Sequence, residues 1–311
     1  MLRYAARRVA AAVLVVFGVT LATFLLMHVE PGDPARAVLG IHATPTAVAA
    51  LRRQWGLNSS LPGQLGHFLS QLVRGDLGQS YIYGVPVSSL IGSHIGETAS
   101  LVAVATVLAV IITVPLAALA ASRQNGWADH LVRAVSVVGL ALPAFWFGIV
   151  LIEVFAVHLH LVPVGGAGSG FGGHLEALLL PGLTASFAMA PILVRSLRVG
   201  MLEVMDAEFI AVARAKGLSG GRVLFAHVAR NALVPTVTLL GLNIAYLIGS
   251  TVIVEQVFNL NGLGSLLLSS ILNRDFPVVQ AVTLVLGTAV VLLNLGTDLL
   301  AARLDPRIRL R

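Results

Sequence analysis

The sequence predicts an all-α polytopic membrane protein, and three observations support this fold class. The 311-residue chain is 57% hydrophobic and 11% charged, with a mean hydropathy of +0.91, which lies outside the range of soluble globular domains. It contains six apolar runs close to the length of about 20 residues that a helix needs to cross a bilayer. Its basic residues gather in alternate connecting segments, as in multi-pass membrane proteins.

The six apolar runs are expected to be transmembrane helices, because a span in lipid must satisfy its backbone hydrogen bonds internally. They cover Val9–Val29, Thr98–Ala121, Ala134–Val157, Ala177–Val194, Ala232–Val254 and Val278–Leu300. The first run is longer than the apolar core of a typical signal peptide and is followed by no small-residue cleavage site, so we expect a retained helix. Kinks are expected at the prolines inside or near the ends of spans, Pro115, Pro143, Pro181 and Pro191.

The basic residues predict that both termini are cytoplasmic. With the N-terminus inside, fifteen of the twenty Lys and Arg residues lie on the cytoplasmic side, where positive charge in short loops is retained. The five that lie outside are Arg36, Arg52, Arg53, Arg74 and Arg274. A pI near 10.7 could also indicate nucleic-acid binding, but the Arg residues form neither a face nor a tail. We therefore expect the chain to lie in a cell membrane, in contact with lipid, and not to bind nucleic acid.

The chain is expected to divide into four segments. Residues 1–29 form a cytoplasmic tail and the first helix, residues 30–97 an extracytoplasmic segment, residues 98–300 a five-helix core with a cytoplasmic loop at 195–231, and residues 301–311 a cytoplasmic tail. Segment 30–97 is too long for a hairpin connection and is rich in turn signals, so a small subdomain is expected there. The short apolar run in NGLGSLLLSSIL, Asn261–Leu272, has the length of an interfacial or re-entrant helix.

The cytoplasmic loop carries a predicted short helix. Asp206 can cap its N-terminus, Glu208 is favoured by the helix dipole, Lys216 lies in the last turn, and Gly217 supplies the left-handed residue that ends it. Phe209 and Ile210 would provide an apolar anchor. Small side chains that would let another backbone approach closely stand at Ala207, Ala211, Ala213 and Ala215.

A second helix is expected from Arg222 through His227, Arg230 and Asn231 into the fifth span at Pro235. The simplest alternative is that this loop only obeys the charge rule for cytoplasmic loops. However, it is longer than topology requires. A helix continuous with two spans could pass motion from a cytosolic partner into the bundle.

Several motifs stand in a fixed order along nearly the whole chain. RAKGL at Arg214–Leu218 is followed by HVARNALVP at His227–Pro235. The others are MLRYAARR, PGDP, GDLGQSYIYGVPV, LALPAFWFG, LVPVGG, GLGSLLLSSILNRDFPVVQA and DPRIR. Together they resemble the B-type permease subunits of ABC importers for dipeptides, oligopeptides and nickel. The general importer signature begins Glu-Ala-Ala, whereas Ala211–Ala213 stand here and Glu208 lies one turn earlier.

The resemblance implies a six-helix bundle like that of ABC type I importers, with a cytoplasmic coupling helix. It implies a permease subunit of an ATP-driven importer, with di- or oligopeptides as the expected cargo and nickel or another small solute as the alternative. The implied partners are a second homologous permease subunit, two cytosolic ATPase subunits or domains, and an extracytoplasmic solute-binding protein. The ATPase-coupling residues are expected to be Asp206, Glu208, Phe209, Ala213, Arg214, Ala215, Lys216, Gly217, His227, Asn231 and Pro235.

No enzymatic site and no cofactor is expected in this chain. LSGGR at Leu218–Arg222 is similar to a signature of ABC ATPases, but the sole lysine, Lys216, is followed by Gly217 and not by Ser or Thr. A phosphate-binding P-loop is therefore missing, and ATP and Mg²⁺ would be bound by partner subunits. The chain has no cysteine, and the alternating His158 and His160 do not predict a metal site by spacing alone.

Two polar residues inside predicted spans are candidates for the translocation pathway. Glu153 is an acid within a span, which is costly and marks a functional site by default. Asn243 can hydrogen-bond between helices or line a pore. The alternative function class is an ion-coupled secondary transporter that uses Glu153 and Asp298, although no inverted repeat is visible. Asp298 is more simply expected to pair with Arg303 or to meet water.

Overall fold

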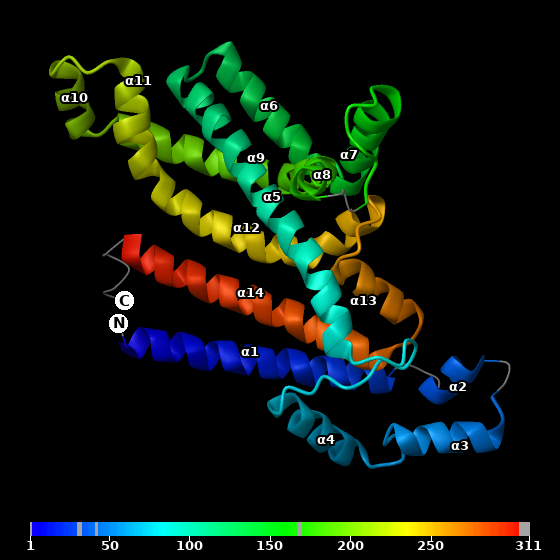
Figure 1. Cartoon of the computed structure of the whole chain (residues 1–311). Helices are drawn as coiled ribbons and strands as arrows, with labels where there is room; N and C mark the ends of the chain where they lie inside the picture. The colour runs from blue at the N-terminus through cyan, green and yellow to red at the C-terminus, as the bar shows by residue number, and fades with distance from the viewer. Residues whose placement is uncertain (1, 30–32, 41–42, 167–169, 305–311) are drawn as a thin grey trace.

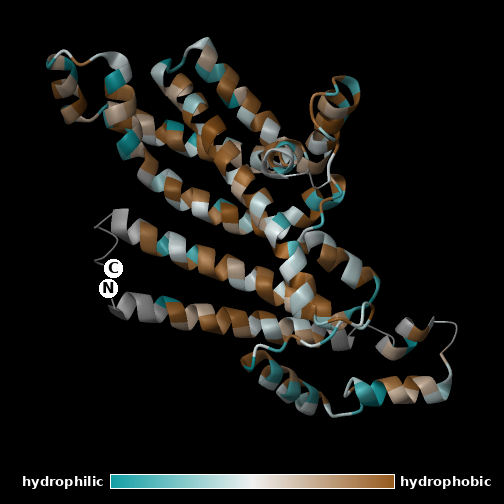
Figure 2. Ribbon diagram, viewed as in Figure 1, coloured by the Kyte–Doolittle hydropathy of each residue, from teal (hydrophilic) through white to brown (hydrophobic). Residues whose placement is uncertain are grey.

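The computed structural model describes residues 2–29, 33–40, 43–166 and 170–304, and these residues are almost entirely helical (Figure 1). Within those ranges, the only extended pairing is one antiparallel bridge between Gln79 and Pro86. The predicted all-α fold class is confirmed. Figure 2 shows that the long helices are predominantly hydrophobic, whereas the helices after the first span carry more hydrophilic residues.

Among the described residues, five helices are long and apolar enough to cross a membrane, and a bent pair makes a possible sixth. The five are α1 (Leu2–Val29), α5 (Val87–Ser122), α9 (Leu179–Met205), α12 (Arg230–Val257) and α14 (Phe276–Leu304). The bent pair is α6 (Trp127–Ala141) with α7 (Ala144–Leu151), which continues into a π-helix, η2 (Ile152–His158). The six predicted spans are thus all helical.

The third predicted span is broken and not merely kinked. Its two helices meet at an angle of 105° at Leu142 and Pro143. Proline lacks an N–H and forces the residue before it out of the helical region, and Leu142 is indeed extended with ψ 134°. In contrast, Pro115 and Pro191 lie inside continuous helices.

Helix α5 begins at Val87, eleven residues before the predicted span, so the boundary drawn after Glu97 falls inside a helix. The hydropathy pattern misses these turns because they contain glycine and polar residues. Packing explains them: Val87 and Ile91 are buried in a cluster with Val278 and Val282 of α14. The same cluster includes residues of α13 (Leu263–Leu272), the short helix that the sequence predicts.

Three short helices occupy the segment after the first span, namely α2 (Pro34–Leu39), α3 (Pro45–Gln54) and α4 (Leu61–Val73). Asp33 and Thr44 cap α2 and α3, and proline follows each cap, an arrangement favoured at helix starts. These helices lie beside one end of the bundle (Figure 1). The described part of this segment thus contains three short helices, and the subdomain stays a prediction.

The centre of the bundle is α9, which packs against α5 and α12. Leu101, Ala105 and Ala109 form a buried stripe of four-residue spacing on α5. Small residues bring the helices close: a Cβ on Gly182 of α9 would lie 2.6 Å from Val104 of α5. At the edge, α1 packs on α14 (Figure 1), and Arg8 pairs with Asp298 at 2.7 Å. Asp298 thus pairs with a residue of α1, whereas the side chain of its expected partner, Arg303, lies outside the described residues.

Candidate functional site

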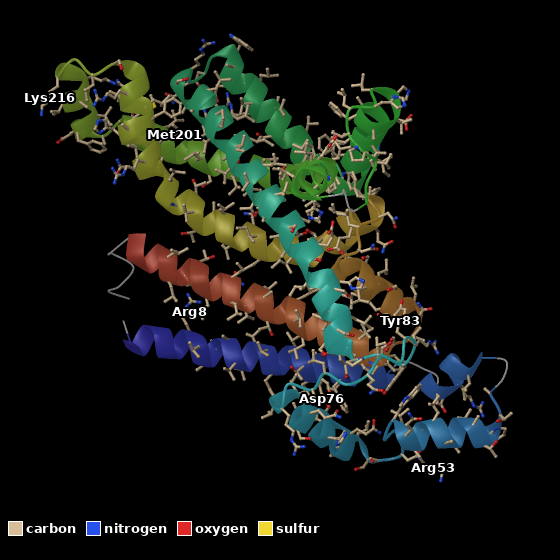
Figure 3. The ribbon with its side chains drawn as sticks, viewed as in Figure 1. Arg8, Arg53, Asp76, Tyr83, Met201 and Lys216 are labelled. Atoms are coloured by element: carbon tan, nitrogen blue, oxygen red, sulfur yellow. The ribbon has the colours of Figure 1, made fainter. Side chains whose placement is uncertain are left out.

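The predicted coupling helix is α10 (Glu208–Ala215), which lies between α9 and the short α11 (Gly220–Arg222). It protrudes from the bundle at the end where α1 begins and α14 ends, and Lys216 marks its tip (Figures 1 and 3). From α11 the chain continues through a π-helix, η3 (Val223–Ala229), into α12 without a break. The loop is therefore joined directly to two long helices.

One of the two predicted ends of this helix is wrong. Asp206 is the last residue of the α9 turn, with its N–H donating to the Leu202 carbonyl at 3.3 Å, and the N-cap of α10 is Ala207, whose methyl group cannot accept a hydrogen bond. Asp206 ends α9 instead of starting α10, because α9 extends eleven residues beyond the predicted end of its span at Val194. At the other end, Gly217 has φ +78°, the left-handed conformation that the sequence predicts.

Helix α10 has a buried face and an exposed apolar face. Ile210 (fully buried) and Ala213 pack in an inner cluster with Val223 of η3 and Met201 of α9. Phe209 and Val212, on the adjacent face about 100° around the helix, are 50% and 54% exposed. The outward anchor is thus Phe209 with Val212, whereas Ile210 and Ala213 fix the helix to its own chain.

The remaining predicted coupling residues lie on α10, directly after it, and on η3 and α12. Glu208, Arg214, Ala215 and Lys216 are exposed. His227 is partly buried, and its carbonyl accepts from Nδ2 of the exposed Asn231 at 2.6 Å. Pro235 lies within α12 and is exposed. A further aromatic that the sequence reading missed, Phe225 of η3, is 58% exposed.

A buried ion pair near the same end ties α6 to α9. The Asp129 carboxylate has no exposed surface and accepts from Nε and Nη2 of Arg198 at 2.6 and 2.7 Å. It also accepts from the Asn125 N–H at 3.0 Å, and Arg133 approaches it at 3.5 Å. Such a bidentate pair fixes both position and orientation. Sequence reasoning missed it, since the charge rule assigns Arg198 to a loop and takes no account of Asp129.

A second buried carboxylate, Glu255, lies near the other end of α12. It accepts from the Thr98 hydroxyl of α5 at 2.7 Å and from the Ser265 N–H of α13 at 2.8 Å. Thr98 accepts in turn from the Leu263 N–H at 2.7 Å. Three helices therefore meet at one carboxylate. Glu255 accepts from one orphan N–H at the start of α13, and Thr98, which donates to Glu255, accepts from a second.

A third buried carboxylate, Asp275, joins α14 to the loop before α5. It accepts from the Ser80 hydroxyl and from the N–H groups of Tyr81 and Ile82, the latter two at 3.0 and 3.4 Å. Tyr81 stacks on Trp55, the residue after α3, with ring centroids 3.7 Å apart. Burial, and then the negative charge of Asp275, raise the pKa of Tyr81 to about 12. The phenol is therefore neutral at physiological pH.

The two candidate pathway residues are not brought together. Glu153 lies on η2 with its side chain 60% exposed, and its Oε1 is 3.4 Å from Nδ1 of His158. Asn243 is partly buried and donates to Leu239, one turn earlier in its own helix, at 2.7 Å. In the described residues, no group of three or more His, Cys, Asp or Glu side chains could hold a metal ion.

A recess with room for about 380 Å³ lies between α5 and α13, at the end of the molecule opposite to α10 (Figure 1). We call it the outer recess, after the orientation that the sequence predicts. Its lining mixes polar and apolar side chains and carries no acid, lysine or arginine. The residues that line it are Tyr83, Leu90, His94, Gln256, Asn261, Ser265, Leu266 and Ser269. Tyr83 is labelled beside this corner in Figure 3. Four of these residues lie in the predicted short helix run Asn261–Leu272, and Tyr83 lies in the motif GDLGQSYIYGVPV. The sequence does not show that they meet His94 and Gln256.

Comparisons with known proteins agree with this architecture. A family model described as "Binding-protein-dependent transport system inner membrane component" matches residues 113–310. A model of the N-terminal part of such membrane components matches residues 1–102. The chain is 38% identical over 309 residues to the glutathione transport system permease protein GsiC of Escherichia coli, covering 99% of each chain. It is also 38% identical to a probable peptide ABC transporter permease protein of Sinorhizobium fredii, covering 98% of this chain and 99% of that protein.

Among solved structures, the chain is similar to the MetNI methionine ABC transporter in its inward-facing conformations. The TM-score is 0.58 with 18% sequence identity, over 70% of this chain and 96% of that chain. This likeness confirms the predicted importer-like bundle. The chain therefore belongs to the family of binding-protein-dependent transport system inner membrane components, as a multi-pass permease subunit of an ABC importer without ATPase activity or a cofactor of its own.

Proposed function

We propose that this permease subunit imports di- or oligopeptides, tripeptides such as glutathione included. In this proposal it forms one half of a heterodimeric pathway, with a second homologous permease, two cytosolic ATPase subunits and an extracytoplasmic binding protein. One observation supports the coupling role best: α10 exposes Phe209 and Val212 while Ile210 anchors it to the bundle. An apolar patch of this kind outside the membrane marks an interaction site.

The proposed orientation places α10 and both ends of the chain in the cytoplasm. The start of α1, the end of α14 and α10 lie at one end of the bundle, and α2, α3, α4 and α13 lie at the other (Figure 1). The end that carries α10 also carries Arg195, Arg198, Arg214 and Lys216. This distribution agrees with the retention of positive charge on the cytoplasmic side.

In this proposal, the coupling helix transmits force through contacts and not through a flexible tether. The inner cluster joins α10 to α5, α9 and η3 by way of Ile210, Ala118, Met201 and Val223. A packed cluster of this kind resists compression, so an ATPase that displaces α10 also displaces the helices behind it. Nucleotide binding can invert the two conformations only if it has a different affinity for each.

The cargo proposal depends on the relatives, whose names specify glutathione and peptides. In this proposal the separate binding protein selects the cargo, so the residues of this chain determine little of the cargo specificity. Nickel stays the alternative cargo. Uptake of glutathione, trialanine and Ni²⁺ by vesicles that contain the complete importer distinguishes the two, because a nickel importer would take up only the metal.

Replacing Gly217 tests the coupling role. We expect Gly217→Val to abolish most ATP-driven uptake, because a β-branched residue is disfavoured at φ +78° and the end of α10 must change. The matched control is Gly220→Ala, at a site with no atom within 4 Å and no positive φ. Uptake and ATPase activity are measured on the reconstituted complex, with membrane insertion checked separately. Normal uptake by Gly217→Val, or transport by the purified chain without ATPases, would refute the coupling role.

A further inference from the structure

The outer recess has the features of a binding site that a short peptide occupies in transit. We propose that it binds the main chain of the cargo through uncharged hydrogen bonds and independently of side-chain identity. This inference rests on the proposed function, since it takes the cargo to be a peptide. Its volume of about 380 Å³ lies within the range of small-molecule sites.

Free amide groups line the recess. The side chains of Gln256 and Asn261 are exposed, and within the described part of the chain neither makes a hydrogen bond. Each carboxamide offers one acceptor and two donor hydrogens, the same groups that a peptide bond requires of its partner. Two such side chains can therefore pair with a peptide main chain whatever its sequence.

His94 adds an acceptor of defined tautomer. Its Nδ1 lies 2.7 Å from the Leu90 carbonyl oxygen, which can only accept, so Nδ1 carries the hydrogen. In the neutral ring, Nε2 then keeps its lone pair for an N–H of the peptide main chain. The phenol of Tyr83 provides a further donor, and Leu90 and Leu266 provide apolar surface for cargo side chains.

The lining carries no fixed charge, which favours transient binding of the cargo during transport over tight retention. Transport requires binding that is favourable enough for entry and weak enough for release. A buried or bidentate ionic contact would hold a peptide terminus tightly and would favour one class of side chain. Neutral hydrogen bonds of modest net free energy, several at once, avoid both effects.

Glu255 is the positioning residue for this site. Ser265 lines the recess, and its N–H donates to Glu255 on the other side of α13 at 2.8 Å. Gly262 and Gly264 let α13 approach this carboxylate, since a Cβ on either would lie 2.4 or 2.9 Å from its atoms. The wall that carries Ser265 and Ser269 is therefore held in a fixed place.

Uptake of radiolabelled trialanine and glutathione by the complete reconstituted importer tests the proposal. We expect the double variant Gln256→Ala/Asn261→Ala to lower the maximal rate for both cargos by about threefold to tenfold, as for one or two lost hydrogen bonds. The ATPase rate stimulated by the loaded binding protein should be retained. Asn273→Ala is the matched control, because Asn273 is exposed at the end of α13 and lies outside the lining. The maximal uptake rate of this variant should equal that of the wild type.

A photo-crosslinking amino acid at position 261 provides a second readout that does not depend on rate. We expect labelled trialanine to be captured at 261 and not at 273 during turnover. Wild-type rates in the double variant, or capture of only a partner subunit at 261, would overturn the recess proposal. Failure of the wild-type importer to take up either peptide would instead overturn the proposed function, so the two failures are distinct.

Discussion

At the scale of single residues, three buried carboxylates hold the helices together, and each uses both of its oxygens. Asp129 binds a guanidinium, whereas Glu255 and Asp275 accept from hydroxyl and N–H groups. Burying a carboxylate destabilises the fold unless hydrogen bonds satisfy its oxygens. When they do, the carboxylate favours one arrangement of the surrounding backbone. These three residues thus fix how the helices are positioned against one another near the two ends of the bundle.

Gly264 gives a prediction at this scale. A Cβ there would lie 2.6 Å from the Val252 Cα and 2.9 Å from Glu255 Oε2, so Gly264→Ala should separate α13 from α12 and destabilise the protein by about 1–3 kcal/mol. The control is Gly249→Ala in α12, with no atom within 4 Å, which should be neutral or slightly stabilising. Thermal unfolding of the purified protein in detergent measures both. Equal midpoints for the two variants would show that α13 is not seated as described.

At the scale of elements, the bidentate pair between Asp129 and Arg198 fixes α6 to α9 and gives a second prediction. Asp129→Asn should cost about 3–5 kcal/mol, because it leaves Arg198 buried without its partner charge. Combining it with Arg198→Gln should cost less than the sum of the two single losses. Thermal unfolding of the four proteins in the cycle measures this coupling.

Arg133→Ala is the control for that cycle. Arg133 approaches Asp129 only at 3.5 Å and is 44% exposed, so its removal should cost at most about 1 kcal/mol. A fully additive cycle for Asp129 and Arg198 would contradict the role of the pair as a clamp between two helices.

The elements also show what the sequence can and cannot predict. Apolar length predicts the existence of the spans and of α13, because lipid imposes one requirement on every residue of a span. It does not predict the first turns of α5 or the last turns of α9, since Val87, Ile91 and Met201 are helical through packing against distant segments. Asp206 was placed at the wrong helix for the same reason.

For the candidate site too, local sequence signals predict some features, whereas others depend on packing between distant segments. The position of α10 and the left-handed Gly217 follow from local signals. The faces of α10 do not, because only the packed structure shows that Ile210 points inward and Phe209 outward. The outer recess joins residues more than 170 positions apart, from His94 to Ser269, and no spacing rule could have assembled it.

At the scale of the whole molecule, orientation in the membrane is directly testable because the chain has no cysteine. Lys216→Cys at the tip of α10 and Asp76→Cys before α5 lie at opposite ends of the bundle (Figure 3). In intact cells, an impermeant maleimide should label Cys at position 76 and not at position 216. In inside-out vesicles the pattern should reverse. Labelling of position 216 from outside would invert the proposed topology and move the recess to the cytoplasm.

The length of α5 has a mechanical consequence for the whole importer. Its 36 residues make a rod of about 54 Å, with Ala117 and Ala118 packed on the inner cluster and Leu90 and His94 beside the recess. A change in tilt of about 10° at one end displaces the other by about 9 Å. In the proposed coupling, ATP hydrolysis at the α10 end would therefore change the width of the recess at the other end, because no loop interrupts α5 between them.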